Sequence, residues 1–492
     1  MRKILLGTTA VVGAALLAPG AFAQTTFGGG GAIGQGVTVP TAPGTVGVAP
    51  EPLNVGRQAP ATPVVVPPTP AMSGAGGLSI RLGGYFAFAA GAVQDDWDRG
   101  RSRNTVPANG TNAARARSRY DFRNDAELNV FVDGRTNNGL TYGAVFELQM
   151  DNVVATAGDG TTVSFDELYG YIGIDGFGTF RFGQEDSAAS LLQVRAPASQ
   201  ALGGDAEWDE FIVQTGLADS VPYIMSGIND GNDATKIIYL SPQFAGFDFG
   251  MSYSPNRNEG ERTNIEGNTS QAQRDRTGLE NELSAAIRYR GTFGPVGVNA
   301  GFGAQFASPP LLNGNGTAIG IRAQNVSAYT AGLVLTGYGF SVGGEYTWGE
   351  YRGSAPAGSA VNAGVDGAKH YLLGATYTMG PLVFGAVFGQ GWQGNGACTI
   401  GPANTSCGVG TAGTIRNLDD RQQTLWGVGV AYNLAPGLVL YGLYNNINDE
   451  NVPTSAPTNA RYTGGAGTNL ASFNGSNTRT INVAVAGIRV AF

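Results

Sequence analysis

Residues 164–185, SFDELYGYIGIDGFGTFRFGQE, are followed about fifty residues later by residues 236–254, KIIYLSPQFAGFDFGMSYS. Each stretch predicts two strands joined by a tight turn, because a short Gly-containing or Pro-containing segment separates two runs of apolar and aromatic residues. The insertion between them is acidic and has no clear periodicity. A loop this long is uncommon in a compact soluble domain and is usually functional. It is reasonable if the insertion folds into the lumen of a large barrel.

Alternation with a period of two residues continues from residue 78 onward, which is typical of strands with two different faces. In one segment, Phe122, Ala126 and Leu128 share a face that opposes Asp121 and Arg123. Similar alternation recurs around residues 78–88, 296–306 and 340–348. A soluble β-sandwich would alternate in the same way, so this pattern alone does not decide the fold.

The connections between the strands decide it. We identify sixteen candidate strands, and the segments that join them alternate between short and long without a break. The short ones are Asp133–Gly139, Asp175–Gly178, Pro242–Gly246, Gly291–Pro295, Thr336–Gly339, Met379–Pro381 and Leu434–Gly437. The long ones are Gln94–Arg117, Met150–Thr162, Asp186–Thr235, Pro255–Leu279, Ala307–Gln324, Gly349–Ala368, Gly391–Asp420 and Asn445–Arg479. Short turns at one rim and long loops at the other predict a sixteen-stranded antiparallel transmembrane β-barrel.

The N-terminal part has a different composition. Residues 1–23 predict a secretory signal peptide, with Arg2 and Lys3 before an apolar run and an Ala-x-Ala cleavage site at Ala21–Ala23. Residues 24–77 are rich in Pro and Gly and predict a flexible tether rather than a packed core; the tether is either a spacer or a periplasmic contact. The barrel is therefore expected over residues 78–492.

The C-terminal segment Asn482–Phe492 places Ala484, Ile488 and the terminal Phe492 on one face and Arg489 on the other. A last strand that ends in an aromatic residue resembles the signal that outer-membrane barrels present to their assembly machinery. A closed barrel leaves no unpaired strand edge in lipid. We therefore expect the last strand to pair with the strand near Leu78–Ala89.

The sequences FDELYGYIGIDGFGTFRFGQED and KIIYLSPQFAGFDFGMSYSP also resemble the general porins of Gram-negative outer membranes, in particular the alphaproteobacterial type. The resemblance is specific in this region and at the C-terminus. It implies that the insertion is the third external loop, residues 186–235, which bends inward and narrows the pore. The N-terminal tether is a departure from this family, which does not need it.

Charge is distributed unevenly in the predicted channel. The insertion carries eight acidic residues against one basic residue, Arg195. The alternation turns the predicted wall arginines away from lipid, where a charge costs up to about 2–4 kcal/mol; they are Arg81, Arg119, Arg123 and Arg181. The family resemblance implies that acids of the inward loop face these arginines across the narrowest point: Asp205, Glu207, Asp209 and Glu210. The alternative is that these acids only solvate an external loop.

No enzymatic or cofactor site is predicted. The single histidine, His370, has no nucleophile signature around it, so we interpret it as a wall or rim residue. Cys398 and Cys407 lie in one long loop, and an even count in an exported chain favours a disulfide over a metal site. The formal charge is −8, or −10 without Arg2 and Lys3, which disfavours a nucleic-acid partner.

These observations predict an outer-membrane channel for the passive diffusion of ions and small hydrophilic solutes, weakly selective for cations. The expected partners are outer-membrane lipid, the barrel-assembly machinery and, from the family resemblance, two further copies in a homotrimer. Two alternatives stay open. One is a substrate-specific uptake channel, and the other is a structural or adhesive surface barrel that does not conduct.

Overall fold

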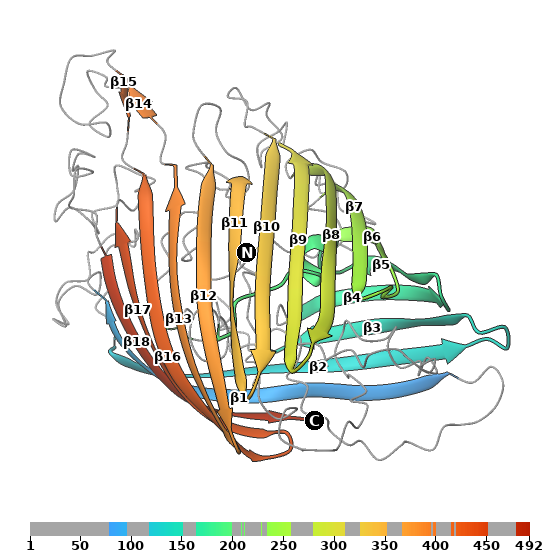
Figure 1. The fold of residues 1–492 in the computed structure, drawn as a ribbon, viewed down its shortest axis with the longest axis horizontal. Coiled ribbons are helices and arrows are strands. Elements are labelled where there is room, and N and C mark those ends of the chain that lie inside the picture. The colour runs from blue at the N-terminus through green and yellow to red at the C-terminus, as the bar shows by residue number, and fades with distance from the viewer. Residues whose placement is uncertain are drawn as a thin grey trace, which may run out of the picture.

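Sixteen strands form one closed antiparallel barrel in the computed structural model (Figure 1). The structure describes residues 78–95, 118–150, 164–198, 208, 211, 228, 234–256, 279–309, 325–351, 367–394, 397–399, 415–417, 420–450 and 479–492. The barrel confirms the fold class and the strand number expected from the sequence. The predicted signal peptide and the predicted tether lie outside the described residues.

Consecutive strands pair around the barrel, except that β13 pairs with β16 and β1 closes the barrel against β18. The first eight barrel strands are β1 (Ser79–Asp95), β2 (Tyr120–Arg135), β3 (Thr141–Gln149), β4 (Ser164–Ile174), β5 (Gly178–Gln184), β6 (Thr235–Leu240), β7 (Phe247–Asn256) and β8 (Glu280–Phe293). The other eight are β9 (Val296–Ser308), β10 (Val326–Gly337), β11 (Phe340–Glu350), β12 (Ala368–Met379), β13 (Leu382–Gln393), β16 (Arg421–Ala435), β17 (Leu438–Glu450) and β18 (Arg479–Ala491).

Three short elements lie between barrel strands. β14 (Ala397–Thr399) and β15 (Ile415–Asn417) form a separate two-stranded sheet within the long connection from β13 to β16. The helix α1 (Ala188–Leu191) begins the connection from β5 to β6. No helix among the described residues is long and apolar enough to cross a membrane.

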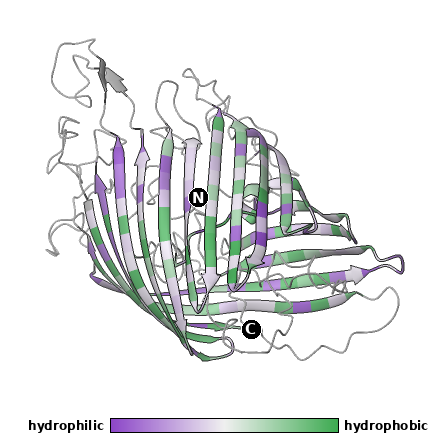
Figure 2. Ribbon diagram, viewed as in Figure 1, coloured by the Kyte–Doolittle hydropathy of each residue, from purple (hydrophilic) through white to green (hydrophobic). Residues whose placement is uncertain are grey.

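Each strand has an apolar outer face and an inner face that faces the lumen. In β7, Phe247, Phe249, Met251 and Tyr253 are about half exposed, whereas Asp248 and Ser252 between them are buried. Hydrophobic and hydrophilic residues alternate in this way along many of the strands (Figure 2). This is the arrangement of a barrel whose outer surface contacts hydrocarbon and whose interior holds the polar side chains.

Tight turns join the strands at one rim, as predicted. The turn between β10 and β11 consists of Tyr338 and Gly339, with φ values of 52° and 83°. Positive φ at both positions is the type I′ geometry that matches the twist of a two-residue hairpin. The strand ends that the long connections join all lie at the opposite rim, because the strands are antiparallel in chain order, as the sequence indicates.

The barrel closes through its first and last strands. The β1–β18 pairing runs from Tyr85 opposite Ala491 to Asp95 opposite Ile481, and Gly84 and Phe492 exchange two backbone hydrogen bonds of 3.1 and 3.0 Å. This confirms the expected pairing of the terminal strands. The Phe492 side chain is half exposed on the outer face.

Candidate functional site

The inner face of β2–β5 is a charged wall. β2 contributes Asp125, Glu127 and Asn129, and β3 contributes Glu147, all of them buried. A register shift between Phe146 and Leu148 changes the alternation in β4. As a result, the adjacent residues Asp166 and Glu167 are both buried, and acidic side chains from three neighbouring strands lie on one part of the wall.

Two of the four predicted wall arginines, Arg123 and Arg181, lie on this wall, and Arg81 lies next to it on β1. Arg81 pairs with Asp133 at 2.9 Å and lies over the Phe131 ring. Arg181 is buried and pairs with Glu185 at 3.0 Å. Arg123 shares the inner face of β2 with Asp125 and Glu127. These arginines are interleaved with acids on the inner face.

Arg119, the fourth predicted wall arginine, lies at the loop rim. It is the residue before β2 and is exposed, and its carbonyl oxygen accepts a hydrogen bond of 2.8 Å from the Val93 N–H. Whether Arg119 lines the lumen therefore stays a prediction.

The first part of the predicted constriction loop, residues 186–198, lies against inner-face side chains. The Ser187 hydroxyl caps α1 by accepting from the Ser190 N–H. The N–H groups of Ala188 and Ala189 donate to the hydroxyls of Ser252 on β7 and Ser284 on β8, at 3.0 and 2.8 Å. Further along, the Ala196 N–H donates to the Glu345 carboxylate on β11 at 3.0 Å. Side chains of three strands therefore hold the loop backbone.

The middle of this loop is described at only three residues, and all three contact the barrel interior. Trp208 is fully buried, and Phe211 packs against the same apolar cluster. Ile228 is buried in a second cluster together with Leu192. The four predicted constriction acids, Asp205, Glu207, Asp209 and Glu210, lie outside the described residues.

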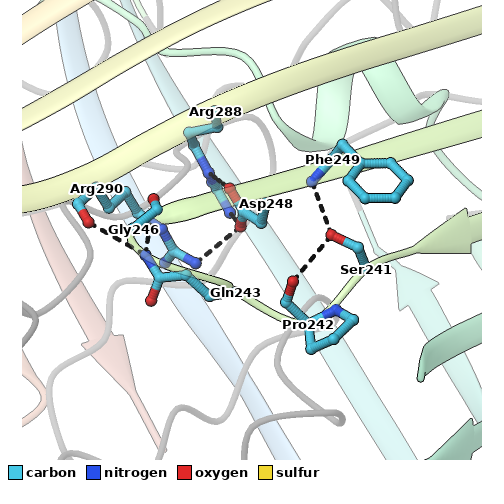
Figure 3. Close-up of polar contacts among 8 residues, drawn as sticks. All are labelled: Ser241, Pro242, Gln243, Gly246, Asp248, Phe249, Arg288 and Arg290. Carbon is cyan, nitrogen blue, oxygen red and sulfur yellow. Dashed lines mark hydrogen bonds and ion pairs between the residues drawn. The ribbon is translucent and has the colours of Figure 1, made fainter. Parts of the chain in front are cut away.

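Two buried ion-pair groups were not among the sequence-predicted site residues. At the turn rim, the Asp248 carboxylate accepts from Arg288 at 3.2 and 2.7 Å and from Arg290 at 2.8 Å (Figure 3). At the loop rim, Arg421 makes two hydrogen bonds of 2.8 and 2.6 Å to Asp449. The alternation contained the signal, since Asp248 lies between the outward Phe247 and Phe249, but the partners come from different strands.

The structure also describes two other residues that the sequence singled out, His370 and Cys398. His370 is buried on β12, and its Nδ1 atom is 2.8 Å from the Tyr351 hydroxyl. Cys398 lies in β14, whereas Cys407 is outside the described residues, so the disulfide stays a prediction. In the described part of the chain, no three His, Cys, Asp or Glu side chains are grouped as metal ligands.

The chain is similar to a known protein family and to several solved structures. The family model described as Gram-negative porin matches residues 7–452. The comparison with curated proteins gave no match. Among solved structures, a triple mutant of the Rh. blastica porin shares 14% identity with a TM-score of 0.45, covering 84% of this chain and 100% of that one. A loop-deletion mutant of OmpT, an outer membrane protein of Vibrio cholerae, also shares 14% identity with a TM-score of 0.45, covering 84% and 99%.

Proposed function

The chain belongs to the family of Gram-negative porins, and from this premise we propose that its barrel passes ions and small hydrophilic solutes by passive diffusion with a weak preference for cations. Membership places the chain in the bacterial outer membrane as a channel-forming β-barrel. The main support for the solutes and the selectivity that we propose is the charged inner wall of β2–β5.

Charge balance supports the preference for cations. Among the described residues, the buried charged side chains comprise eleven acids and seven bases, not counting His370. Several of these buried bases form ion pairs with acids: Arg181 pairs with Glu185, and Arg288 pairs with Asp248. An excess of fixed negative charge along a narrow path raises the local concentration of cations and lowers that of anions.

We also propose that residues 186–235 form the constriction, with Asp205, Glu207, Asp209 and Glu210 contributing to its negative charge. The hydrogen bonds from Ala188, Ala189 and Ala196 to the inner faces of β7, β8 and β11 support a loop that follows the inside of the wall. The homotrimer, the use of the C-terminal Phe492 by the assembly machinery, and the Cys398–Cys407 disulfide belong to the same proposal.

Single-channel recording of the purified protein in a planar bilayer tests the function. We expect a stable open conductance, and under a salt gradient a reversal potential of the sign that cation selectivity gives. Clear anion selectivity would contradict the charge argument. Block of the current by a low concentration of one solute would favour a substrate-specific channel, and a lack of conductance would favour a non-conducting surface barrel.

A further inference from the structure

One arc of the inner wall is mostly apolar and is interrupted by Gln423 and Asn445, although the interior of a water-filled barrel is normally polar. The inner faces of β16, β17 and β18 carry a set of buried apolar side chains, which Ala89 and Val93 extend onto β1 and Leu372, Val383 and Val387 extend onto β12 and β13. The set on the last three strands is Leu425, Ala431, Val439, Tyr441, Leu443, Ile447, Ile481, Val483 and Val485. Pairing across the strands brings members of this set together, since Ile447 lies opposite both Leu425 and Ile481.

Residues of the predicted constriction loop belong to the same apolar cluster. Trp208 has no exposed surface and belongs to the same cluster, together with Ala196 and Ala198 of the loop. Phe211 packs against the cluster, and its N–H donates to the Trp208 carbonyl at 3.3 Å. Within the part of the chain that the structure describes, the indole Nε1–H has no hydrogen-bond partner, and the described contacts of the ring are apolar.

Glycines of the inner wall leave room for the loop. A Cβ atom added at Gly332 of β10 would overlap the Val194 carbonyl oxygen, and one at Gly374 of β12 would overlap that of Pro197. On β1, a Cβ atom at Gly91 would overlap the Phe211 ring. Side chains at these three positions would displace the loop.

From these contacts we propose that Trp208 is a positioning residue that fixes the constriction loop on the apolar arc of β1, β12, β13 and β16–β18. Glu207 and Asp209 are its immediate neighbours in the chain. The position of Trp208 therefore determines where the acidic part of the loop lies. The position of these acids in turn sets the conductance and the selectivity of the pore. This inference deepens the proposed channel function and depends on it.

The test compares Trp208→Ala with Trp208→Phe in the full-length chain reconstituted in planar bilayers. Apolar contact without a hydrogen bond predicts that the Phe variant keeps the wild-type conductance and reversal potential. The Ala variant is expected to show a noisier open state and a reversal potential shifted toward zero. A purely structural role would affect folding yield without this separation between the two variants.

Gly91→Ala provides a second test that leaves Trp208 intact. Because it displaces Phe211, we expect it to shift the reversal potential in the same direction as Trp208→Ala. The control is Gly442→Ala on the outer face of β17, where the nearest atom to the added Cβ lies at 3.9 Å, and wild-type behaviour is expected.

The rate of thiol labelling reports directly whether Trp208 shields the apolar cluster from water. Val485→Cys places a thiol within the apolar cluster, and a water-soluble thiol reagent should label it severalfold faster when combined with Trp208→Ala. The chain without Val485→Cys gives the background from Cys398 and Cys407. Wild-type currents in Trp208→Ala and unchanged labelling would overturn the inference. If the wild-type protein itself fails to conduct, the proposed function fails first.

Discussion

Arg489 of β18 lies over the ring of Tyr85 of β1, with its guanidinium carbon 3.6 Å from the ring centroid. Both side chains are buried on the inner face, and the Tyr85 hydroxyl donates to Asp125 on β2 at 3.2 Å. Tyr85 thus links three neighbouring strands where the first strand meets the last. A cation stacked on a buried ring contributes about 2 kcal/mol.

Removing the Tyr85 ring is expected to weaken this closure. Tyr85→Ala should lower the free energy of unfolding by about 3–5 kcal/mol, because it removes a buried aromatic side chain and the contact with Arg489. Tyr85→Phe keeps the ring and loses only the hydrogen bond to Asp125, at about 1 kcal/mol. Urea unfolding in lipid vesicles measures both, and equal losses would contradict the role given to the ring.

Neutralising Asp248 should destabilise the barrel at the turn rim. In Asp248→Asn, Arg288 and Arg290 lose their shared counter-charge, and breaking a buried pair of this kind costs about 3–5 kcal/mol. The more positive wall should also shift the reversal potential toward anions.

Asp175→Asn is the matched control for Asp248. Asp175 pairs with Arg135 at 3.0 Å at the protein surface. The Asp175 side chain is 57% exposed and the Arg135 side chain is 51% exposed. An exposed pair contributes at most about 1 kcal/mol. Similar losses of stability in the two variants would mean that burial does not distinguish the two pairs.

The outer face is expected to contact hydrocarbon, and one substitution tests this. Val428 lies at the centre of β16 and is 46% exposed on the outer face. Val428→Arg should lower the free energy of unfolding by about 2–4 kcal/mol in vesicles, whereas a charge near the interface costs about 0–1 kcal/mol. Phe244→Arg in a tight turn is the control. A small cost at Val428 would argue against a lipid-facing surface.

Selectivity is expected to depend on where the loop acids lie. Replacing Asp205, Glu207, Asp209 and Glu210 by their amides should lower the cation-to-anion permeability ratio, since fixed charge at the narrowest point dominates ion preference. Replacing Glu259, Glu261 and Glu266 of the next long loop by Gln changes net charge by a similar amount elsewhere. If both sets shift the reversal potential equally, the four acids do not lie at a constriction.

Much of the fold was predictable because it depends on local patterns. Alternation in β7, from Phe247 to Ser254, assigns each side chain to a face, and the Tyr338–Gly339 turn fixes one hairpin. The same alternation places Arg81, Arg123 and Arg181 among the inward-facing side chains, whereas Arg119 directly precedes β2, and where a strand begins depends on cross-strand pairing.

By itself, the sequence determined the number of strands, their order and the face of nearly every side chain, because period-two alternation and turn residues act over a few positions. Only the tertiary structure decided which charges meet and where the loop lies. Asp248, Arg288 and Arg290 come from two strands, and Trp208 shares an apolar cluster with residues of β1 and of strands more than 150 residues further along the chain. Such contacts depend on barrel closure and strand register, which bring together residues with no local relationship in the sequence.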